Sequence, residues 1–286
     1  MRKLFTILIY TLVVLLIGRN LPALPRFNLL SDASSYVTSL KKETQGLLPK
    51  NQGNYGVYFI NIKDGESFGI NEEMTFTAAS VNKVPIVAVL YYLNSKGKIN
   101  LDDQITLQER DIQDYGTGTL RYQKPGGVYS LRTLARLSLQ QSDNTAAHIL
   151  GERIGKGTIQ SVIEEWGMLQ TDMEENKTSP KDMGILFQKI YAFEVASPAL
   201  TRELFGFMKD TDIEDRLPKK LPPDAGAFHK TGDAVGQLHD VGIISRGDLV
   251  FYLGVMSSDI GKDEALAKET IAEIARNTIA FYAKRQ

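Results

Sequence analysis

Hydrophobic positions in the first third of the chain follow a helical and then a strand pattern. Residues 38–48 predict a helix. Residues 56–62 (GVYFINI) and 66–70 are short runs of strand length, and the polar turn Lys63-Asp64-Gly65 separates them. Together they predict a helix followed by a β-hairpin.

Helical periods dominate the middle of the chain. Residues 81–93 (VNKVPIVAVLYYL) are apolar on nearly every face and too long for a strand, so they predict a helix that is buried on all sides. Further helices are predicted at residues 131–140, 144–154, 158–166, 181–193 and 198–209.

Strand patterns return near the end of the chain. Residues 241–245 and 249–256 predict two strands, and residues 263–283 predict a closing helix. Because strands occur toward both ends, we expect an α/β (α+β) fold in which one sheet is built from both and a helical lobe is inserted between them. The expected parts are an α/β lobe of residues 31–75 and 218–286 and a helical lobe of residues 76–217.

The N-terminal segment has the pattern of an export signal. Arg2 and Lys3 precede an apolar run over residues 4–17, which is short for a membrane span of about 20 residues but suits a secretory signal. The best cleavage position, Ala23, fits poorly because Leu21 lies two residues before it. We therefore expect residues 1–30 to be a signal peptide or, slightly favoured, an uncleaved signal anchor held through residues 4–18, and the protein to be exported.

Composition narrows the available chemistry. The net charge of -1 offers no basic surface for nucleic acid, and the absence of cysteine excludes disulfides, lipoprotein anchoring and thiol catalysis. Three scattered histidines, His148, His229 and His239, leave little for a metal cluster. We therefore expect no cofactor and no metal, and catalysis must come from hydroxyl, amine or carboxylate groups.

Ser80 and Lys83 are the first candidate pair. The spacing of three residues places the lysine amine one helical turn beyond the serine hydroxyl. A lysine at the mouth of an apolar helix needs a polar cavity, and desolvation lowers its pKa so that it can act as a base. The same spacing occurs at Ser39/Lys42 and Ser95/Lys98, but those pairs lie in polar stretches and are interpreted as surface residues.

Two further motifs follow in order. Ser142-Asp143-Asn144 begins 62 residues after Ser80 (80 to 142). Lys230-Thr231-Gly232 begins 88 residues after Ser142 (142 to 230). Taken singly, the first is an ordinary helix cap and the second an ordinary strand end. Their joint occurrence in this order favours a catalytic set.

With these motifs the sequence resembles the class A β-lactamase family of penicillin-recognising serine hydrolases over residues 31–286. The likeness extends to residues 76–85, 129–134, 141–147, 178–180 and 215–218. It implies an antiparallel sheet flanked by helices, an all-α lobe, and an active site in the cleft between them.

The resemblance implies an acyl-enzyme mechanism. Ser80 would attack an amide carbonyl and Lys83 would take its proton. The backbone amides of Ser80 and Asp233 would form the oxyanion hole, while Ser142, assisted by the charge of Lys230, would return a proton to the leaving nitrogen.

The resemblance also implies the substrate contacts. Asn144 would hydrogen-bond the substrate's side-chain amide, and Lys230 and Thr231 would bind its carboxylate. Gly232 would let the sheet edge approach the ligand. Tyr115 is either a rim residue of the cleft or an ordinary loop aromatic.

The sequence departs from the family ahead of the Thr178-Ser179-Pro180 segment. Class A enzymes carry there a long Ω-shaped loop whose glutamate activates the deacylating water, with an asparagine four residues later. Residues 167–178 are too short for that loop, and Asn176 directly follows Glu174 and Glu175. The deacylation base is therefore left open as Glu174, Glu175 or none.

A second departure concerns carboxylate binding, because no arginine occurs in residues 231–245. His239 is either a substitute donor or a structural partner of Asp240. His229 should lie on the opposite strand face from Lys230, as a core or surface residue.

Three functions remain compatible with these residues. Hydrolysis of β-lactam amides is the leading hypothesis. The alternatives are a D-alanyl-D-alanine carboxypeptidase or transpeptidase acting on cell-wall peptide, and a slowly deacylating penicillin-binding sensor.

Overall fold

The computed structural model describes residues 29–284, with side chains from Tyr36. The chain divides into two units, residues 1–36 and residues 37–286, and helix α2 (Leu29–Leu47) begins in the first and ends in the second. The export signal expected in residues 4–18 lies outside the described residues. Over residues 29–284, no helix has the length and apolar character needed to cross a membrane.

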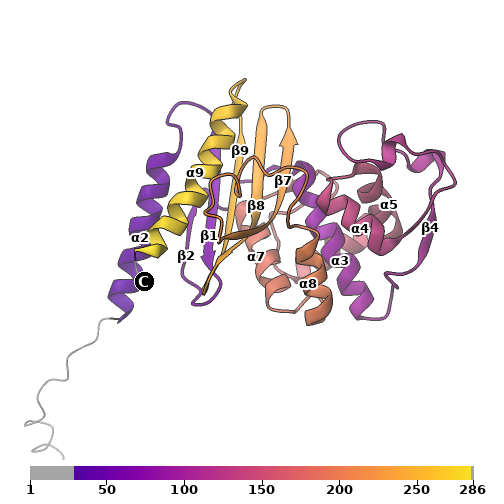
Figure 1. Ribbon diagram of the computed structural model, residues 1–286, viewed down its shortest axis with the longest axis horizontal. Coiled ribbons are helices and arrows are strands. Elements are labelled where there is room, and N and C mark those ends of the chain that lie inside the picture. The colour runs from indigo at the N-terminus through magenta and orange to yellow at the C-terminus, as the bar shows by residue number, and fades with distance from the viewer. Residues whose placement is uncertain (1–28, 285–286) are drawn as a thin grey trace, which may run out of the picture. The chain divides into compact units, whose positions relative to one another are not determined.

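A five-stranded antiparallel sheet is the framework of the larger unit (Figure 1). Its strand order is β2-β1-β9-β8-β7, so the first and last strands along the sequence meet through the β1–β9 pair. This confirms the prediction of a sheet built from both parts of the chain. The strands are β1 (Asn54–Asn61), β2 (Ser67–Ile70), β7 (Gly226–Ala234), β8 (Gln237–Arg246) and β9 (Leu249–Ser258).

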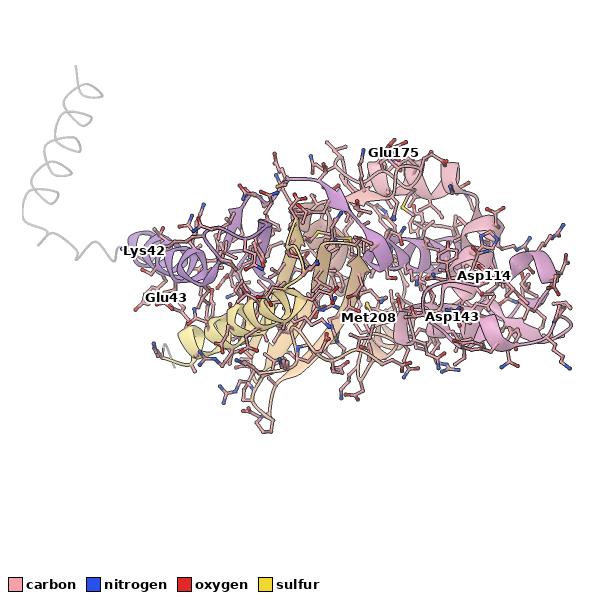
Figure 2. The ribbon with its side chains drawn as sticks, turned by 90° about the horizontal axis from the view of Figure 1, so that it is seen from above. Lys42, Glu43, Asp114, Asp143, Glu175 and Met208 are labelled. Atoms are coloured by element: carbon pink, nitrogen blue, oxygen red, sulfur yellow. The ribbon has the colours of Figure 1, made fainter. Side chains whose placement is uncertain are left out.

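One face of the sheet is covered by residues 37–47 of α2 and by α9 (Glu264–Ala283), which lie side by side in Figure 1. Leu40, Phe59 and Ile271 belong to the buried apolar cluster on this side. Between the two helices, Asn277 donates a hydrogen bond to the Glu43 carboxylate at 3.0 Å (Glu43 is labelled in Figure 2). Helix α2 begins at Leu29 rather than at the predicted residue 38.

Helix α7 (Pro180–Tyr191) covers the opposite face and contacts β1, β8 and β9. Its first residue accepts a hydrogen bond at the carbonyl oxygen from the buried Tyr252 hydroxyl at 2.8 Å. Although α7 falls in the stretch expected for the helical lobe, it packs on the sheet, because its buried residues Leu186 and Phe187 face the large central cluster.

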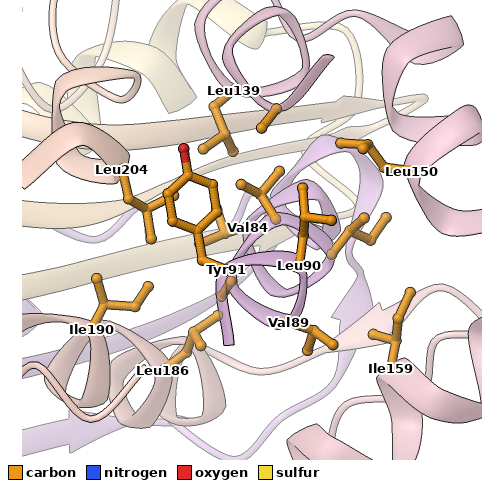
Figure 3. Packing of buried hydrophobic residues seen from close by; sticks show 14 of the residues in the cluster. Val84, Val89, Leu90, Tyr91, Leu139, Leu150, Ile159, Leu186, Ile190 and Leu204 are labelled. Atoms are coloured by element: carbon orange, nitrogen blue, oxygen red, sulfur yellow. The ribbon is translucent and has the colours of Figure 1, made fainter. Parts of the chain in front are cut away.

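Helix α3 (Lys83–Ser95) is the buried centre of the helical part. In Figure 3, Leu186 of α7 and Leu150 and Ile159 lie on different sides of it, which confirms the prediction of a helix enclosed all round. The surrounding helices are α4 (Leu131–Gln140), α5 (Asn144–Ile154), α6 (Lys156–Glu165) and, beyond α7, α8 (Pro198–Gly206).

Several short elements lack any periodic pattern in the sequence. Ser80 lies within the 3-10 helix η1 (Ala79–Asn82), which precedes α3, so the buried helix begins at Lys83, two residues later than predicted. The other elements are β3 (Phe76–Thr77) paired with β6 (Lys177–Thr178), β4 (Gln104–Thr106) paired with β5 (Val128–Ser130), and the 3-10 turns η2 (Glu109–Asp111) and η3 (Leu120–Tyr122).

Candidate active site

Ser80 lies in a tight turn between β3 and α3. The preceding Ala79 has a φ of +50°, a left-handed conformation that costs a non-glycine residue about 1–2 kcal/mol. The Ala78 amide donates to the Asn176 carbonyl at 2.7 Å, which ties this turn to the short loop ahead of α7. The half-buried Ser80 lines a cavity of about 550 Å³.

Lys83 is buried, with 4% of its surface exposed. Its Nζ donates to the Ser142 carbonyl, to Ser142 Oγ at 3.1 Å and to Asn144 Oδ1 at 2.7 Å. Burial, reinforced by repulsion from Lys230 and opposed by Asp143, lowers the pKa of Lys83 to about 6. A large fraction of this amine is therefore neutral at pH 7, and among the described side chains no hydrogen bond joins it to Ser80.

Ser142 lies between two lysines. Its Oγ accepts hydrogen bonds from Lys83 Nζ at 3.1 Å and from Lys230 Nζ at 3.0 Å. The residue has a φ of +56° and is followed by Asp143, whose carboxylate caps α5 at the Ala146 amide at 2.9 Å. The cap therefore fixes the turn that aims the Ser142 hydroxyl at both amines.

Lys230 is buried in β7 and also donates to the Thr231 carbonyl at 3.0 Å. Burial lowers its pKa to about 8, because the opposing charges of Asp240 and Asp233 offset only part of the desolvation. Lys230 and the buried Thr231 lie behind Ser142 and do not line the main cavity. Of the remaining predicted residues, Asn144 and Asp233 do line it.

Gly232 packs against the nucleophile turn. A Cβ at this position would lie 2.9 Å from Val81 Cγ2 and 3.0 Å from the Ala78 carbonyl oxygen. The small residue is therefore needed for contact between β7 and η1, in addition to the close approach to the ligand that the family resemblance implies.

Arg216 is a site residue that the sequence analysis missed as such. It is fully buried and donates to the His239 carbonyl at 2.8 Å, to the Gly232 carbonyl at 3.4 Å and to the Asp233 carboxylate. It thus supports the end of β7 that carries the expected oxyanion amide. The signal for this residue was its place in residues 215–218, which resemble the family, outside residues 231–245 where a carboxylate-binding arginine was expected.

The two strand histidines have structural partners. In His239, Nε2 lies 2.9 Å from the Thr77 carbonyl and Nδ1 accepts from the Ser257 amide at 3.2 Å. Burial lowers the pKa of His239 to about 4, so the ring is neutral and both nitrogens are engaged. This geometry leaves no N–H of His239 for a substrate carboxylate.

Asp240 pairs with His229 and not with the neighbouring His239. His229 Nδ1 lies 2.8 Å from Asp240 Oδ1, and Nε2 lies 3.1 Å from Glu214 Oε1. Burial acts to lower the pKa of His229, but the two carboxylates outweigh it and raise the pKa to about 9. His229 is therefore a charged residue in the core. It lies on the opposite face of β7 from Lys230, as strand alternation predicts.

The candidate deacylation bases differ in position. Glu174 lines the cavity, but its side chain is 76% exposed and its carboxylate lies 3.1 Å from Lys156 Nζ. Glu175, labelled in Figure 2, lies 3.7 Å from Lys177 Nζ and does not line the cavity.

Tyr115 also lines the cavity, and its carbonyl accepts a hydrogen bond from Asn144 Nδ2 at 3.1 Å. Within residues 29–284 there is no group of three acidic or histidine side chains suited to a metal ion.

The antiparallel sheet, the buried helix and the two lysines around Ser142 together define an active-site serine hydrolase. The beta-lactamase enzyme family matches residues 39–282, and the chain belongs to this family of serine hydrolases. This agrees with the family resemblance of the motifs.

Among the relatives, beta-lactamase SME-1 of Serratia marcescens is 24% identical over 90% of this chain and 92% of its own length. The beta-lactamase of Bacillus licheniformis is 26% identical over 84% of this chain and 82% of its own. The solved structure of PBP-A has 29% identity and a TM-score of 0.81 over 87% of this chain and 97% of that one. A mutant of PBP-A, 28% identical with a TM-score of 0.80, is an acyl-enzyme complex with penicillin G.

Proposed function

We propose that the protein opens the cyclic amide of β-lactams by forming an acyl-enzyme on Ser80, and then hydrolyses the acyl-enzyme. The observation that carries this proposal is the position of Ser142 Oγ, which bridges the amines of Lys83 and Lys230 at 3.1 and 3.0 Å. This bridge gives a proton a route from the nucleophile side of the cavity to the leaving-group side.

Acylation begins at the neutral Lys83 amine, whose lone pair accepts the Ser80 hydroxyl proton as Oγ bonds to the β-lactam carbonyl carbon. The backbone amides of Ser80 and Asp233 stabilise the oxyanion. Lys83 then passes the proton through Ser142, 3.1 Å away, to the ring nitrogen as the carbon–nitrogen bond breaks. In this acylation step the proton that leaves Ser80 therefore ends on the ring nitrogen.

The remaining polar groups bind the substrate. Asn144, which Lys83 orients through a hydrogen bond, would accept a hydrogen bond from the substrate's side-chain amide or donate one to it. Lys230 and Thr231 would attract the carboxylate, while the buried guanidinium of Arg216 is paired with Asp215 and Asp233 and supports this end of β7.

The test is a β-lactam hydrolysis assay of residues 30–286 with Ser80→Ala and Ser95→Ala as matched variants. Ring opening should be lost with Ser80→Ala and unchanged with Ser95→Ala, because Ser95 belongs to the exposed serine–lysine pair at the end of α3. Equal hydrolysis by the wild type and Ser80→Ala would overturn the proposal.

A second function, that of a slowly deacylating penicillin-binding sensor, is favoured by the glutamates of the short loop. Glu174 and Glu175 are exposed and each forms an ion pair with a lysine, which leaves no buried carboxylate in residues 167–178 to activate a water. The lifetime of the penicillin adduct separates the two functions. Persistence for hours supports the second function, whereas rapid loss that slows in Glu174→Gln but not in Glu175→Gln makes Glu174 the deacylation base.

We also propose export through the N-terminal segment, since Arg2, Lys3 and the apolar run have the order of a secretory signal. Cell fractionation with an antibody to the folded domain would place the protein in the envelope or medium. Recovery from the cytoplasm alone would contradict export.

A further inference from the structure

The active-site cavity extends along one face of α5, beyond the groups that the proposed mechanism uses. It is lined by Asn144, Ala147, His148, Gly151 and Glu152. These positions are spaced by three or four residues, so they form a single helical stripe. With a rise of about 1.5 Å per residue, the stripe continues for about 12 Å from Asn144 to Glu152.

The short loop ahead of α7 forms one wall of this part of the cavity. Thr171 Oγ1 donates to Asp182 Oδ2 at 2.8 Å, and the Met173 amide donates to Gln160 Oε1 at 2.9 Å, so the loop is held to α7 and α6. The buried Met173 and Ile159 line the cavity as apolar wall residues. We name the part lined by α5, α6 and this loop the distal arm.

The distal arm has more negatively charged than positively charged side chains. Lys156 and Glu174 form an ion pair at 3.1 Å and cancel one another. Glu152 makes no hydrogen bond or ion pair with any described residue, and neither does the half-buried His148. The arm therefore has an apolar wall and one unpaired, exposed carboxylate at the end of the α5 stripe opposite Asn144.

We propose that the distal arm binds acyl donors whose side chain is long, flexible and ends in an ammonium group. The chain would pack on Ile159 and Met173, and the ammonium would bind Glu152. This inference rests on the proposed acylation of Ser80 and names the substrate class for it: β-lactams whose acyl side chain is long and ends in an ammonium group.

The test compares two penicillins whose acyl groups are aminooctanoyl and acetamido-octanoyl, with benzylpenicillin as the reference. Second-order acylation rates are followed by intact-mass spectrometry on residues 30–286. The free amine should acylate roughly fivefold faster than its acetylated partner, consistent with an ion pair of about 1 kcal/mol. Glu152→Gln should abolish this preference, while Glu165→Gln, an exposed glutamate at the end of α6, should retain it.

A steric variant tests the arm independently of charge. A Cβ at Gly151 meets no atom within 4 Å, so Gly151→Leu places its side chain in the arm without a clash in the helix. It should slow both octanoyl penicillins relative to benzylpenicillin, and Gly157→Leu, an exposed α6 glycine with equally open space, should not.

The outcomes separate the two proposals. Acylation by benzylpenicillin with equal rates for the two octanoyl compounds, in the wild type and in Glu152→Gln, would overturn the distal arm and leave the proposed function intact. Absence of any Ser80-dependent adduct with all three penicillins would overturn the proposed function itself.

Discussion

At the residue scale, the site depends on two lysines whose pKa values are lowered to different extents. Lys83 reaches about 6 and Lys230 about 8, both mainly because burial disfavours the ammonium form. Between about pH 6 and pH 8 the Lys83 amine is therefore largely neutral and the Lys230 amine is largely charged. The sequence predicted a lowered lysine pKa from the apolar context of Lys83, but the separation of the two values depends on Asp143, Asp233 and Asp240, which only the fold brings near.

We predict a bell-shaped pH dependence of acylation. The rate should rise through about pH 6 as Lys83 loses its proton and fall above about pH 8 as Lys230 loses its own. Lys230→Arg should shift the alkaline limb upward, since a guanidinium stays charged. A rate that is flat between pH 5 and 9 would contradict these roles.

Lys83→Met tests the base directly. Acylation by benzylpenicillin should fall by about 10²–10⁴-fold, the range for loss of a general base. Lys98→Met, which removes the exposed lysine of another serine–lysine pair, should acylate at the wild-type rate. Undiminished acylation in Lys83→Met would remove Lys83 from the mechanism.

At the element scale, the long periodic segments were the predictable part. The bounds of α4 and α5 agree with the predicted ranges of residues 131–140 and 144–154. The sequence could not predict η1 or the β3–β6 pair, since elements of two to four residues have no hydrophobic period. These short elements position Ser80, so the geometry of the nucleophile was the least predictable part of the site.

The contact between β7 and η1 gives a prediction at this scale. Gly232→Ala should lower the free energy of unfolding by about 1–3 kcal/mol and slow acylation, because the new Cβ would overlap Val81 and the Ala78 carbonyl. Gly226→Ala on the same strand is the control, as its Cβ would meet its nearest neighbour at 3.5 Å. Denaturant titration of both variants measures the difference. Equal stability would mean that the turn adjusts.

At the scale of the whole folded unit, strand patterns in both parts of the chain predicted the shared sheet and the inserted helices. The pattern could not show that α7 belongs with the sheet, because a helix buried on one face gives the same period whichever partner it meets. Nor could it show the hydrogen-bonded triad of Glu214, His229 and Asp240, whose members come from separate segments.

This triad predicts a pH-dependent part of stability. Because the pKa of His229 is raised to about 9 in the folded protein, its contribution is fully present below about pH 6.5 and is lost as the pH rises through about 9. The difference in unfolding free energy between the wild type and His229→Gln should therefore shrink over that interval. A difference that grows with pH would contradict a charged His229.

The central claim is that Ser80 is the acylated residue, and peptide mapping of the quenched penicillin complex tests it most directly. Wild-type protein mixed briefly with benzylpenicillin, acid-quenched and digested should have the penicilloyl mass on the peptide that contains Ser80, with none on Ser142. A covalent mass on Ser142 or on a lysine, with Ser80 unmodified, would contradict the account.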